Sequence, residues 1–182
     1  MKNIVYPFFR NALLILFINS LPGSAFAQTA AVIDASKYST LQQAVDALPA
    51  SGGIVRIPPG NYEINKPLLL KTENTRLQGS GGSTHLINKN TSGEPAIIVS
   101  SGKGELFRLE LSGFRISGNP KSGDGIYMEK VQELMITDMT IDHNGGHGIN
   151  MKDCTENPRI ANCNLNYNLK AGINIDGGHD IV

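Results

Sequence analysis

The sequence predicts an all-β solenoid, a right-handed parallel β-helix whose N-terminal end is covered by a helical cap. The first observation is a repeat of the form Gly-Ile-x-Met/Ile at residues 125–128, 148–151 and 172–175, which begin 23 and 24 residues apart. A unit this short cannot bury its own apolar face, so neighbouring units must stack and pair equivalent strands in parallel. The second is that no convincing helical period follows residue 53. The irregular Gly and Asn turns disfavour a left-handed hexapeptide solenoid, and leucine-rich repeats would need a Leu framework that is missing.

A second register runs in step with the first and ends on Asn119, Asn144 and Asn168. Stacked asparagines can pass amide hydrogen bonds from coil to coil and tolerate a left-handed backbone at a sharp bend, so we expect a structural ladder, with ligand binding as the alternative. The alternating apolar residues of each coil should point inward. They are Phe114, Ile116, Ile126, Met128, Ile136, Met139, Ile141, Ile149, Met151, Ile160, Cys163, Leu165, Ile173 and Ile175.

The chain divides into three expected segments: a signal peptide at 1–27, a cap at 28–53, and β-helix coils at 54–182. The cap contains a helix at 39–48, in which Ser39 is the N-cap and Gln42 completes a capping box. Its apolar face would cover the open end of the first coil. The coil that begins at Gly172 is shorter than its predecessors, so we expect further coils or another chain to cover the C-terminal end.

The N-terminal 27 residues have the form of a secretory signal peptide. Lys2 and Arg10 give a positive start, an apolar run follows at 12–18, and Ala25–Ala27 is an A-x-A cleavage pattern. The run is too short for a membrane anchor, which needs about 20 apolar residues. We therefore expect a secreted or periplasmic protein, cleaved near Ala27 and not bound to a membrane.

Charge and cysteine content bear on the expected binding partners and on disulfide bonding. Lys plus Arg and Asp plus Glu are 16 each, which argues against nucleic acid as a partner because no basic excess exists. The two cysteines, Cys154 and Cys163, fit small core side chains better than a disulfide, although export would permit a bridge.

The cap carries a family resemblance. Residues 40–47 read Thr-Leu-Gln-Gln-Ala-Val-Asp-Ala, followed by Gly-Gly-Ile-Val at 52–55 and Pro-Gly-Asn-Tyr at 59–62. With the repeats, this pattern resembles the pectate-lyase-like superfamily over residues 33–182. The resemblance implies an exported protein that acts on or binds an acidic polysaccharide, as a lyase, hydrolase or epimerase. A non-catalytic glycan-binding or surface protein, or an inactive fragment of a longer one, remains the alternative, so catalysis itself is undecided. The resemblance also allows calcium, but no acidic cluster marks a site.

Candidate site residues follow from the register and from short motifs. Asp124 and His147 occupy the same position in adjacent coils, where a carboxylate beside an imidazole would suit proton transfer. Asp142 and His143 lie nearby in sequence and are further catalytic candidates. The alternative is that all four are solvated turn residues without a catalytic role. Gly146–Gly148 is similar to the G-H-G of polygalacturonases, but no adjacent Asp pair accompanies it.

Basic residues complete the set of candidates. Lys121 and Lys152 are the expected substrate-binding cations, and no metal ligands are expected. The register places Arg108 over Glu133 as a surface pair. A lyase with an arginine base would draw it from Arg108, Arg115 or Arg159, among which the sequence does not choose.

Overall fold

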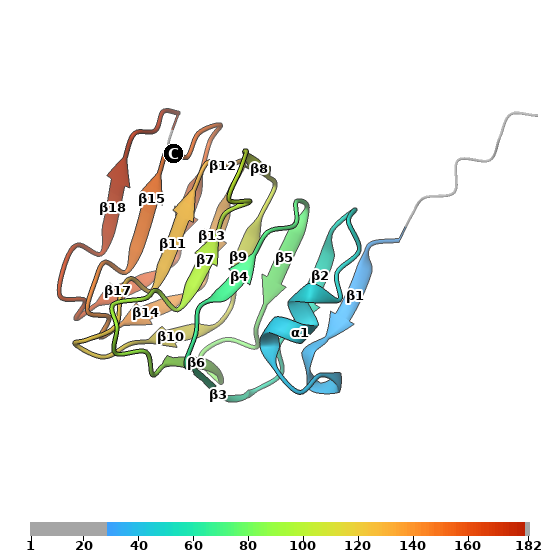
Figure 1. Ribbon diagram of the computed structural model, residues 1–182, viewed down its shortest axis with the longest axis horizontal. Coiled ribbons are helices and arrows are strands. Elements are labelled where there is room, and N and C mark those ends of the chain that lie inside the picture. The colour runs from blue at the N-terminus through green and yellow to red at the C-terminus, as the bar shows by residue number, and fades with distance from the viewer. Residues whose placement is uncertain (1–28, 181–182) are drawn as a thin grey trace, which may run out of the picture.

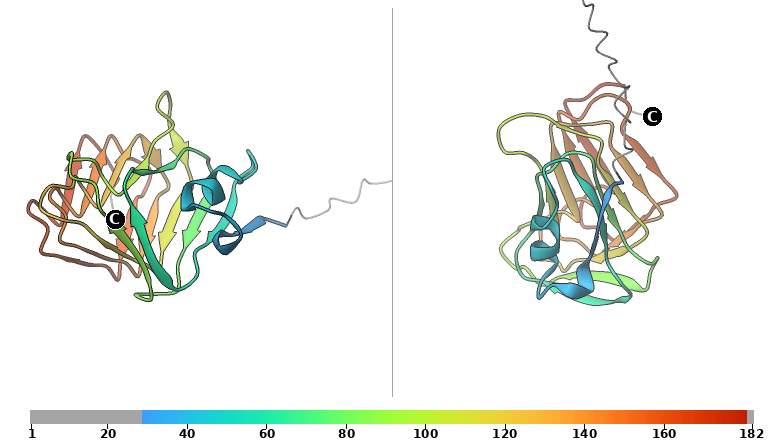
Figure 2. Two further views of the ribbon diagram at one scale, coloured as in Figure 1. Left: turned by 60° about the horizontal axis from the view of Figure 1, so that its bottom comes forward. Right: turned by 90° about the vertical axis from the view of Figure 1, so that its right-hand side faces the viewer.

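The computed structural model describes residues 29–180 and shows a right-handed parallel β-solenoid of about six turns (Figure 1). Every strand pair is parallel, and successive strands of a coil enter three different sheets. Figure 2 shows these sheets enclosing a common core when the solenoid is viewed from the end that carries the helix. The predicted fold class is therefore confirmed.

The strands are grouped by sheet as follows. Sheet A has the order β1 (Ala31–Asp34), β2 (Gly53–Arg56), β5 (Thr75–Gln78), β9 (Glu110–Ser112), β13 (Met135–Thr137) and β16 (Arg159–Ala161). Sheet B has the order β3 (Gly60–Ile64), β6 (Thr84–Asn88), β10 (Arg115–Ser117), β14 (Thr140–Asp142) and β17 (Asn164–Asn166). Sheet C has the order β4 (Leu68–Leu70), β7 (Ile97–Val99), β11 (Ile126–Glu129), β15 (Ile149–Lys152) and β18 (Ile173–Asp176). Strands β8 (Leu106–Phe107) and β12 (Val131–Gln132) form a small fourth sheet.

The repeat sets the register of the last coils. Ile126 pairs with Ile149, which pairs with Ile173, and the equivalent residues of sheets A and B align in the same way. Nine of the residues expected to face inward are fully buried, and Ile160, Cys163 and Leu165 pack against them at the end of the core. Ile173 and Ile175 are 40% and 47% exposed, contrary to expectation, because within residues 29–180 no strand pairs with the far edge of β18.

The asparagine ladder forms in part. The Nδ2 of Asn144 donates to the Oδ1 of Asn168 at 2.9 Å, and the backbone N–H of Asn144 donates to the same oxygen. Asn119 instead donates to the backbone carbonyls of Asn88 and Asn90 in the preceding coil, both at 2.9 Å. The asparagines do not have the expected left-handed backbone, which occurs one residue earlier, at His143 and Tyr167.

The cap differs from the prediction by one residue and has an additional strand. Helix α1 spans Leu41–Asp46, and its N-cap is Thr40, whose hydroxyl accepts from the N–H of Gln43, so Ser39 is not the cap. A short 3-10 helix, η1, spans Ala35–Lys37. Strand β1, which sequence analysis did not identify, pairs with β2 and extends sheet A beyond the first coil. No helix within residues 29–180 is long and apolar enough to cross a membrane.

Gln42 covers the edge of sheet C and does not close a capping box. Its Oε1 accepts from the backbone N–H of Leu69 at 2.8 Å, and its Nε2 donates to the Leu69 carbonyl at 3.2 Å. The side-chain amide thereby bonds both backbone groups of the middle residue of β4, the first strand of sheet C. These groups would otherwise form an unpaired edge.

The signal peptide expected at 1–27 lies outside the described residues. Cys154 and Cys163 are both free, as the favoured interpretation required. Cys154 is buried, its Sγ lies 3.6 Å from the Lys152 carbonyl, and burial raises the pKa of its thiol.

We predict that Gln42→Ala lowers the free energy of unfolding by about 1–3 kcal/mol, because the two Leu69 backbone groups lose their partners. Chemical denaturation of purified protein measures this change. Gln43→Ala is the matched control, since Gln43 is exposed one position further along the same helix. Equal effects of the two substitutions would show that the Leu69 contacts add nothing.

We also predict that Gly125→Ala is destabilising by about 1–3 kcal/mol, because the added methyl group has no room. A Cβ at Gly125 would lie 2.4 Å from Cγ2 of Ile141 and 2.7 Å from the Gly148 carbonyl oxygen. Gly104→Ala is the control, because nothing lies within 4 Å of its Cβ position. Thermal melts of the two variants should differ, and coinciding melts would contradict the packing argument.

Candidate functional site

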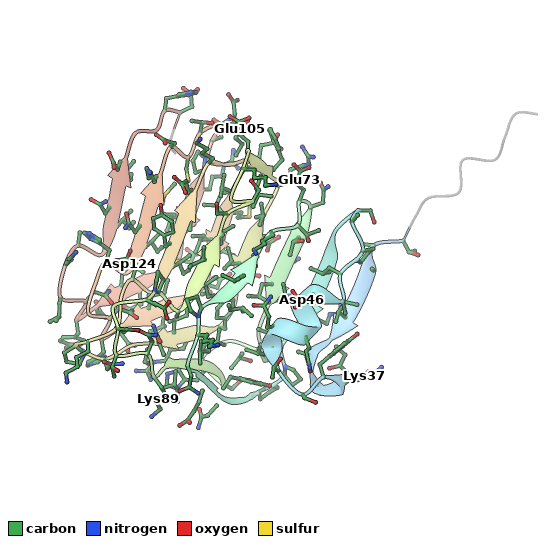
Figure 3. The ribbon with its side chains drawn as sticks, in the orientation of Figure 1. Lys37, Asp46, Glu73, Lys89, Glu105 and Asp124 are labelled. Carbon is green, nitrogen blue, oxygen red and sulfur yellow. The ribbon has the colours of Figure 1, made fainter. Side chains whose placement is uncertain are left out.

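The most connected group of polar side chains lies on the outer face of sheet B. Alternation along the strands turns Arg115 and Ser117 of β10 outward, while Ile116 between them is buried. Arg115 pairs in register with His85 of β6, and Ser117 pairs with Asp142 of β14. We call His85, Arg115, Ser117, Asp142 and His143 the sheet B cluster. In Figure 3 the labelled Lys89, which directly follows β6, lies on this side of the molecule.

Asp142 is the centre of this cluster. It is 4% exposed, and the Arg115 guanidinium donates to its two oxygens from Nε at 2.9 Å and from Nη2 at 3.1 Å. His143 Nδ1 lies 2.8 Å from Oδ1 of Asp142. Burial alone would raise the pKa of Asp142, but hydrogen bonds from Arg115, His143 and Ser117 outweigh it and hold the pKa below the usual value of 3.8. The carboxyl group is therefore ionised at neutral pH and can only accept hydrogen bonds.

This ionised carboxylate fixes the orientation of His143. Because Asp142 only accepts, the proton of neutral His143 lies on Nδ1, and Nε2 carries a free lone pair. The His143 side chain is 59% exposed and its backbone is left-handed, with a φ of 56°. Its ring stacks on that of Tyr167, with centroids 5.2 Å apart and planes at 29°. An imidazole held in this way by a carboxylate has the geometry of a general base.

The other side of the cluster is a histidine–serine contact. Nε2 of His85 lies 2.6 Å from Oγ of Ser117. Burial, followed by the positive charge of Arg115, lowers the pKa of His85 below 6.5, and Asp142 only partly opposes this. The histidine ring and the serine hydroxyl share this hydrogen bond, and the tautomer of His85 sets which of them donates. His85 is therefore neutral near pH 7 and connects the cluster to the preceding coil.

Asp124 and His147 lie in contact between adjacent coils, as the register predicted, but not through the imidazole ring. Oδ1 of Asp124 accepts from the backbone N–H of His147 at 2.6 Å, and Oδ2 accepts from Asn150 Nδ2 at 2.8 Å. Nδ1 of His147 accepts from the backbone N–H of Ala171 at 3.2 Å. Both side chains thus bond one coil to the next. Figure 3 labels Asp124 beside β11, on the sheet C side.

The two candidate lysines lie apart from each other. Lys152 on sheet C is paired with Glu129 at 2.9 Å, and Lys121 is an exposed residue of the connection between β10 and β11. The predicted surface pair also forms, with 3.7 Å between Arg108 Nη1 and Glu133. Both partners are half exposed, so we expect the pair to add little stability.

Calcium finds no matching ligand set in the described part of the chain. The one group of three potential metal ligands there is Glu156, His179 and Asp180, all exposed. Calcium takes six to eight oxygen ligands, whereas this group offers two carboxylates and an imidazole that is already bonded to Asp180. The group does not fit calcium.

Sequence analysis named Asp142 and His143 as candidates but not the residues that contact them. Arg115 was one of three arginines considered together, and the structure distinguishes it as the one bonded to Asp142. Its register position opposite Thr140 was available from the repeat. His85 carried no such signal, because the connection between β7 and β8 is longer than its equivalent between β11 and β12 and interrupts the repeat spacing in its coil.

Comparison with known proteins agrees with the architecture. The family described as "Right handed beta helix region" matches residues 70–182, more than half of the chain, so the protein belongs to that family. No curated protein sequence matches the chain significantly.

Two solved structures share the fold. One is ORF18 of Geobacillus virus E2, with a TM-score of 0.59 and 18% identity over 71% of this chain and 31% of the viral one. The other is the A-module of mannuronan C-5 epimerase AlgE4 from Azotobacter vinelandii, also with a TM-score of 0.59 and 18% identity, over 83% of this chain and 55% of the module. The chain thus spans about a third of the first structure and about half of the second. At this identity the likeness concerns the fold alone.

We predict that His85 makes the protein less stable in mild acid. A histidine whose pKa is lowered in the folded state is protonated more readily in the unfolded chain. Stability should therefore fall as the pH drops below the unfolded value of 6.5. Denaturant unfolding at about pH 7.5 and about pH 5.5 should show a smaller loss in His85→Gln than in the wild type. His179→Gln is the control, because His179 is exposed, and it should keep the wild-type pH dependence. A His85→Gln variant with that same dependence would contradict the assignment.

Proposed function

We propose that the protein is exported and carries out proton transfer on an acidic polysaccharide bound along sheet B. The observation that carries this proposal is the bond between buried, ionised Asp142 and exposed His143, which leaves Nε2 of the imidazole as a free base. Export is proposed from the signal-like sequence of residues 1–27, which lie outside the described part of the chain. The polysaccharide is proposed from the fold it shares with an epimerase module and from the cap motif.

The chemistry that suits this cluster is removal of a proton from carbon. In a uronate residue, the hydrogen on the carbon next to the carboxylate is the acidic one. His143 Nε2 would take that proton, and Asp142 would stabilise the imidazolium that forms. In a lyase, the carbanion forms a double bond to the neighbouring carbon, and the bond from that carbon to the glycosidic oxygen breaks while the oxygen takes a proton from water. In an epimerase, the carbanion takes a proton from water on the face opposite His143.

Hydrolysis suits the cluster less well. A glycoside hydrolase needs one carboxyl group to protonate the leaving oxygen and a second carboxylate as base or nucleophile. Asp142 is ionised and engaged by Arg115, His143 and Ser117, so it has no proton to give. No second carboxylate contacts the cluster through the ion pairs found in residues 29–180.

The spacing of the strands on the outer face of sheet B also suits a polysaccharide chain that runs across them. Parallel strands lie about 4.8 Å apart, close to the length of one sugar unit. Beyond Asp142 the face continues with Asn164 and Asn166, both exposed amides that can bond sugar hydroxyls. Exposed Lys121 remains a candidate for binding the sugar carboxylates.

We predict that His143→Ala abolishes turnover of polygalacturonate or alginate while leaving the fold intact, since the side chain is largely exposed. Absorbance of unsaturated uronate detects a lyase, and proton NMR in D2O detects epimerisation. His179→Ala is the matched control, because His179 is an exposed histidine with the same Nδ1 contact to an adjacent aspartate, at 2.9 Å. Undiminished turnover in His143→Ala would refute the assigned base. Binding without turnover in the wild type would instead support a non-catalytic glycan-binding protein.

A further inference from the structure

The short contact between His85 and Ser117 is not used by the proton transfer proposed above. Nε2 of His85 lies 2.6 Å from Oγ of Ser117, and both side chains are half-buried on the outer face of sheet B. Strand β6, which carries His85, is paired with β3 and β10, and β10, which carries Ser117, is paired with β6 and β14. The contact therefore lies inside the sheet, between strands that are paired on both sides.

The protonation state of His85 suits a base. Burial and then the positive charge of Arg115 lower the pKa of the ring below 6.5, so the ring is neutral near pH 7 and can accept a proton. With the ring proton on Nδ1, Nε2 accepts the hydrogen bond from the serine hydroxyl. A base within hydrogen-bond reach of Oγ is what activates a serine as a nucleophile. The pair thus has the geometry of a serine–histidine dyad.

Two neighbours of Ser117 suit the reaction of an ester. Arg115 lies two residues earlier on the same face of β10, and its Nε and Nη2 bond to Asp142, the register partner of Ser117. The guanidinium therefore lies alongside the serine, where a charged donor can stabilise the oxyanion that forms when Oγ attacks a carbonyl. On the opposite side Ser117 pairs in register with half-buried Ile87, which offers an apolar contact for an acyl group.

We propose that Ser117 and His85 form a catalytic dyad that hydrolyses acyl esters, such as the O-acetyl groups of a polysaccharide bound along sheet B. This activity differs from proton transfer at His143 and uses the other side of the sheet B cluster. Only the alcohol half of the ester, the polysaccharide, rests on the proposed function. Cleavage of the ester itself depends on the dyad alone.

Ester cleavage at the dyad has two steps. In the first, Oγ of Ser117 bonds to the carbonyl carbon while its proton moves to Nε2 of His85, and the carbonyl oxygen becomes an oxyanion beside Arg115. The bond from the carbonyl carbon to the alcohol oxygen then breaks, and that oxygen takes the proton from His85. In the second, water attacks the acyl-serine and gives a proton to His85, the bond to Oγ breaks, and Oγ takes that proton back. The products are the alcohol and the carboxylic acid, and nothing is oxidised or reduced.

A fluorophosphonate, which phosphonylates activated serines, tests the dyad without any polysaccharide. It should modify Ser117 in the purified full chain, and trypsin should release the modified residue in the peptide 116–121, in which Ser117 is the only hydroxyl side chain. His85→Gln should slow the labelling about a hundredfold, as expected when a general base is removed. Ser83→Ala is the matched control and should be labelled like the wild type, because Ser83 is an exposed serine whose Oγ bonds to a backbone carbonyl at 2.6 Å.

Turnover of p-nitrophenyl acetate completes the test of the dyad. Ser117→Ala should lose this turnover while its thermal melt stays within a few degrees of the wild type, since one half-buried hydroxyl is removed. An unmodified Ser117 in wild-type protein treated with the fluorophosphonate would overturn the dyad, whatever the variants do. Equal labelling rates in the wild type and His85→Gln would also overturn it, because the serine would then react without its base.

Acetylated alginate and acetylated polygalacturonate test the alcohol half of the ester, and failure of the two proposals can be told apart. Acetate should be released by the wild type and not by Ser117→Ala. If Ser117 is labelled but neither polymer loses acetate, the dyad stands and the polysaccharide assignment falls. If Ser117 is labelled and His143→Ala leaves uronate turnover unchanged, the dyad stands and the proton transfer falls. If turnover depends on His143 but Ser117 is not labelled, the dyad falls. If neither label nor turnover is found, both fall.

Discussion

Parallel pairing of each coil with the next is the interaction on which the whole structure depends. At strand spacing, a residue in one coil lies directly beside its equivalent in the neighbouring coils, so each position must suit the same position on either side. The core shows this in the rows of Ile126 with Ile149 and of Met128 with Met151. The close corner before β11 shows it more strictly, because Ile141 and the Gly148 carbonyl leave no space for a Cβ at Gly125.

The same constraint assembles the polar site from distant parts of the sequence. His85, Arg115 and Asp142 belong to three successive coils and meet because β6, β10 and β14 are neighbours in sheet B. No single coil holds the cluster. Asp142 stays ionised although buried, because its own coil and the preceding coil together supply its hydrogen-bond donors, whereas burial alone would have raised its pKa.

Much of this was predictable from the sequence, and the failures have physical causes. Inward positions followed from strict alternation, since side chains at one phase of each strand enter the core, which is mostly apolar. Contacts between coils were predictable at the level of residues but not of atoms. Asp124 does meet His147, yet through a backbone N–H, because repeat spacing fixes Cα positions and leaves the side-chain rotamer free. The helix cap lies at Thr40 and not Ser39, and the side chain of Gln42 bonds to β4, a tertiary contact that no local motif encodes. His85 was not predicted because the irregular connection between β7 and β8 interrupts the repeat spacing that would have shown its register.

At the left-handed corners, the chemistry of the surface and the stability of the coil depend on different parts of the same residue. At His143 and Tyr167 the left-handed backbone makes the turn, while the side chain is exposed to water and does not pack in the core. Mutation at such a position is therefore free to alter the chemistry of the surface without reducing the stability of the coil. Over evolutionary time, a lineage of these solenoids can exchange one activity for another by single substitutions along one corner while every buried row is preserved.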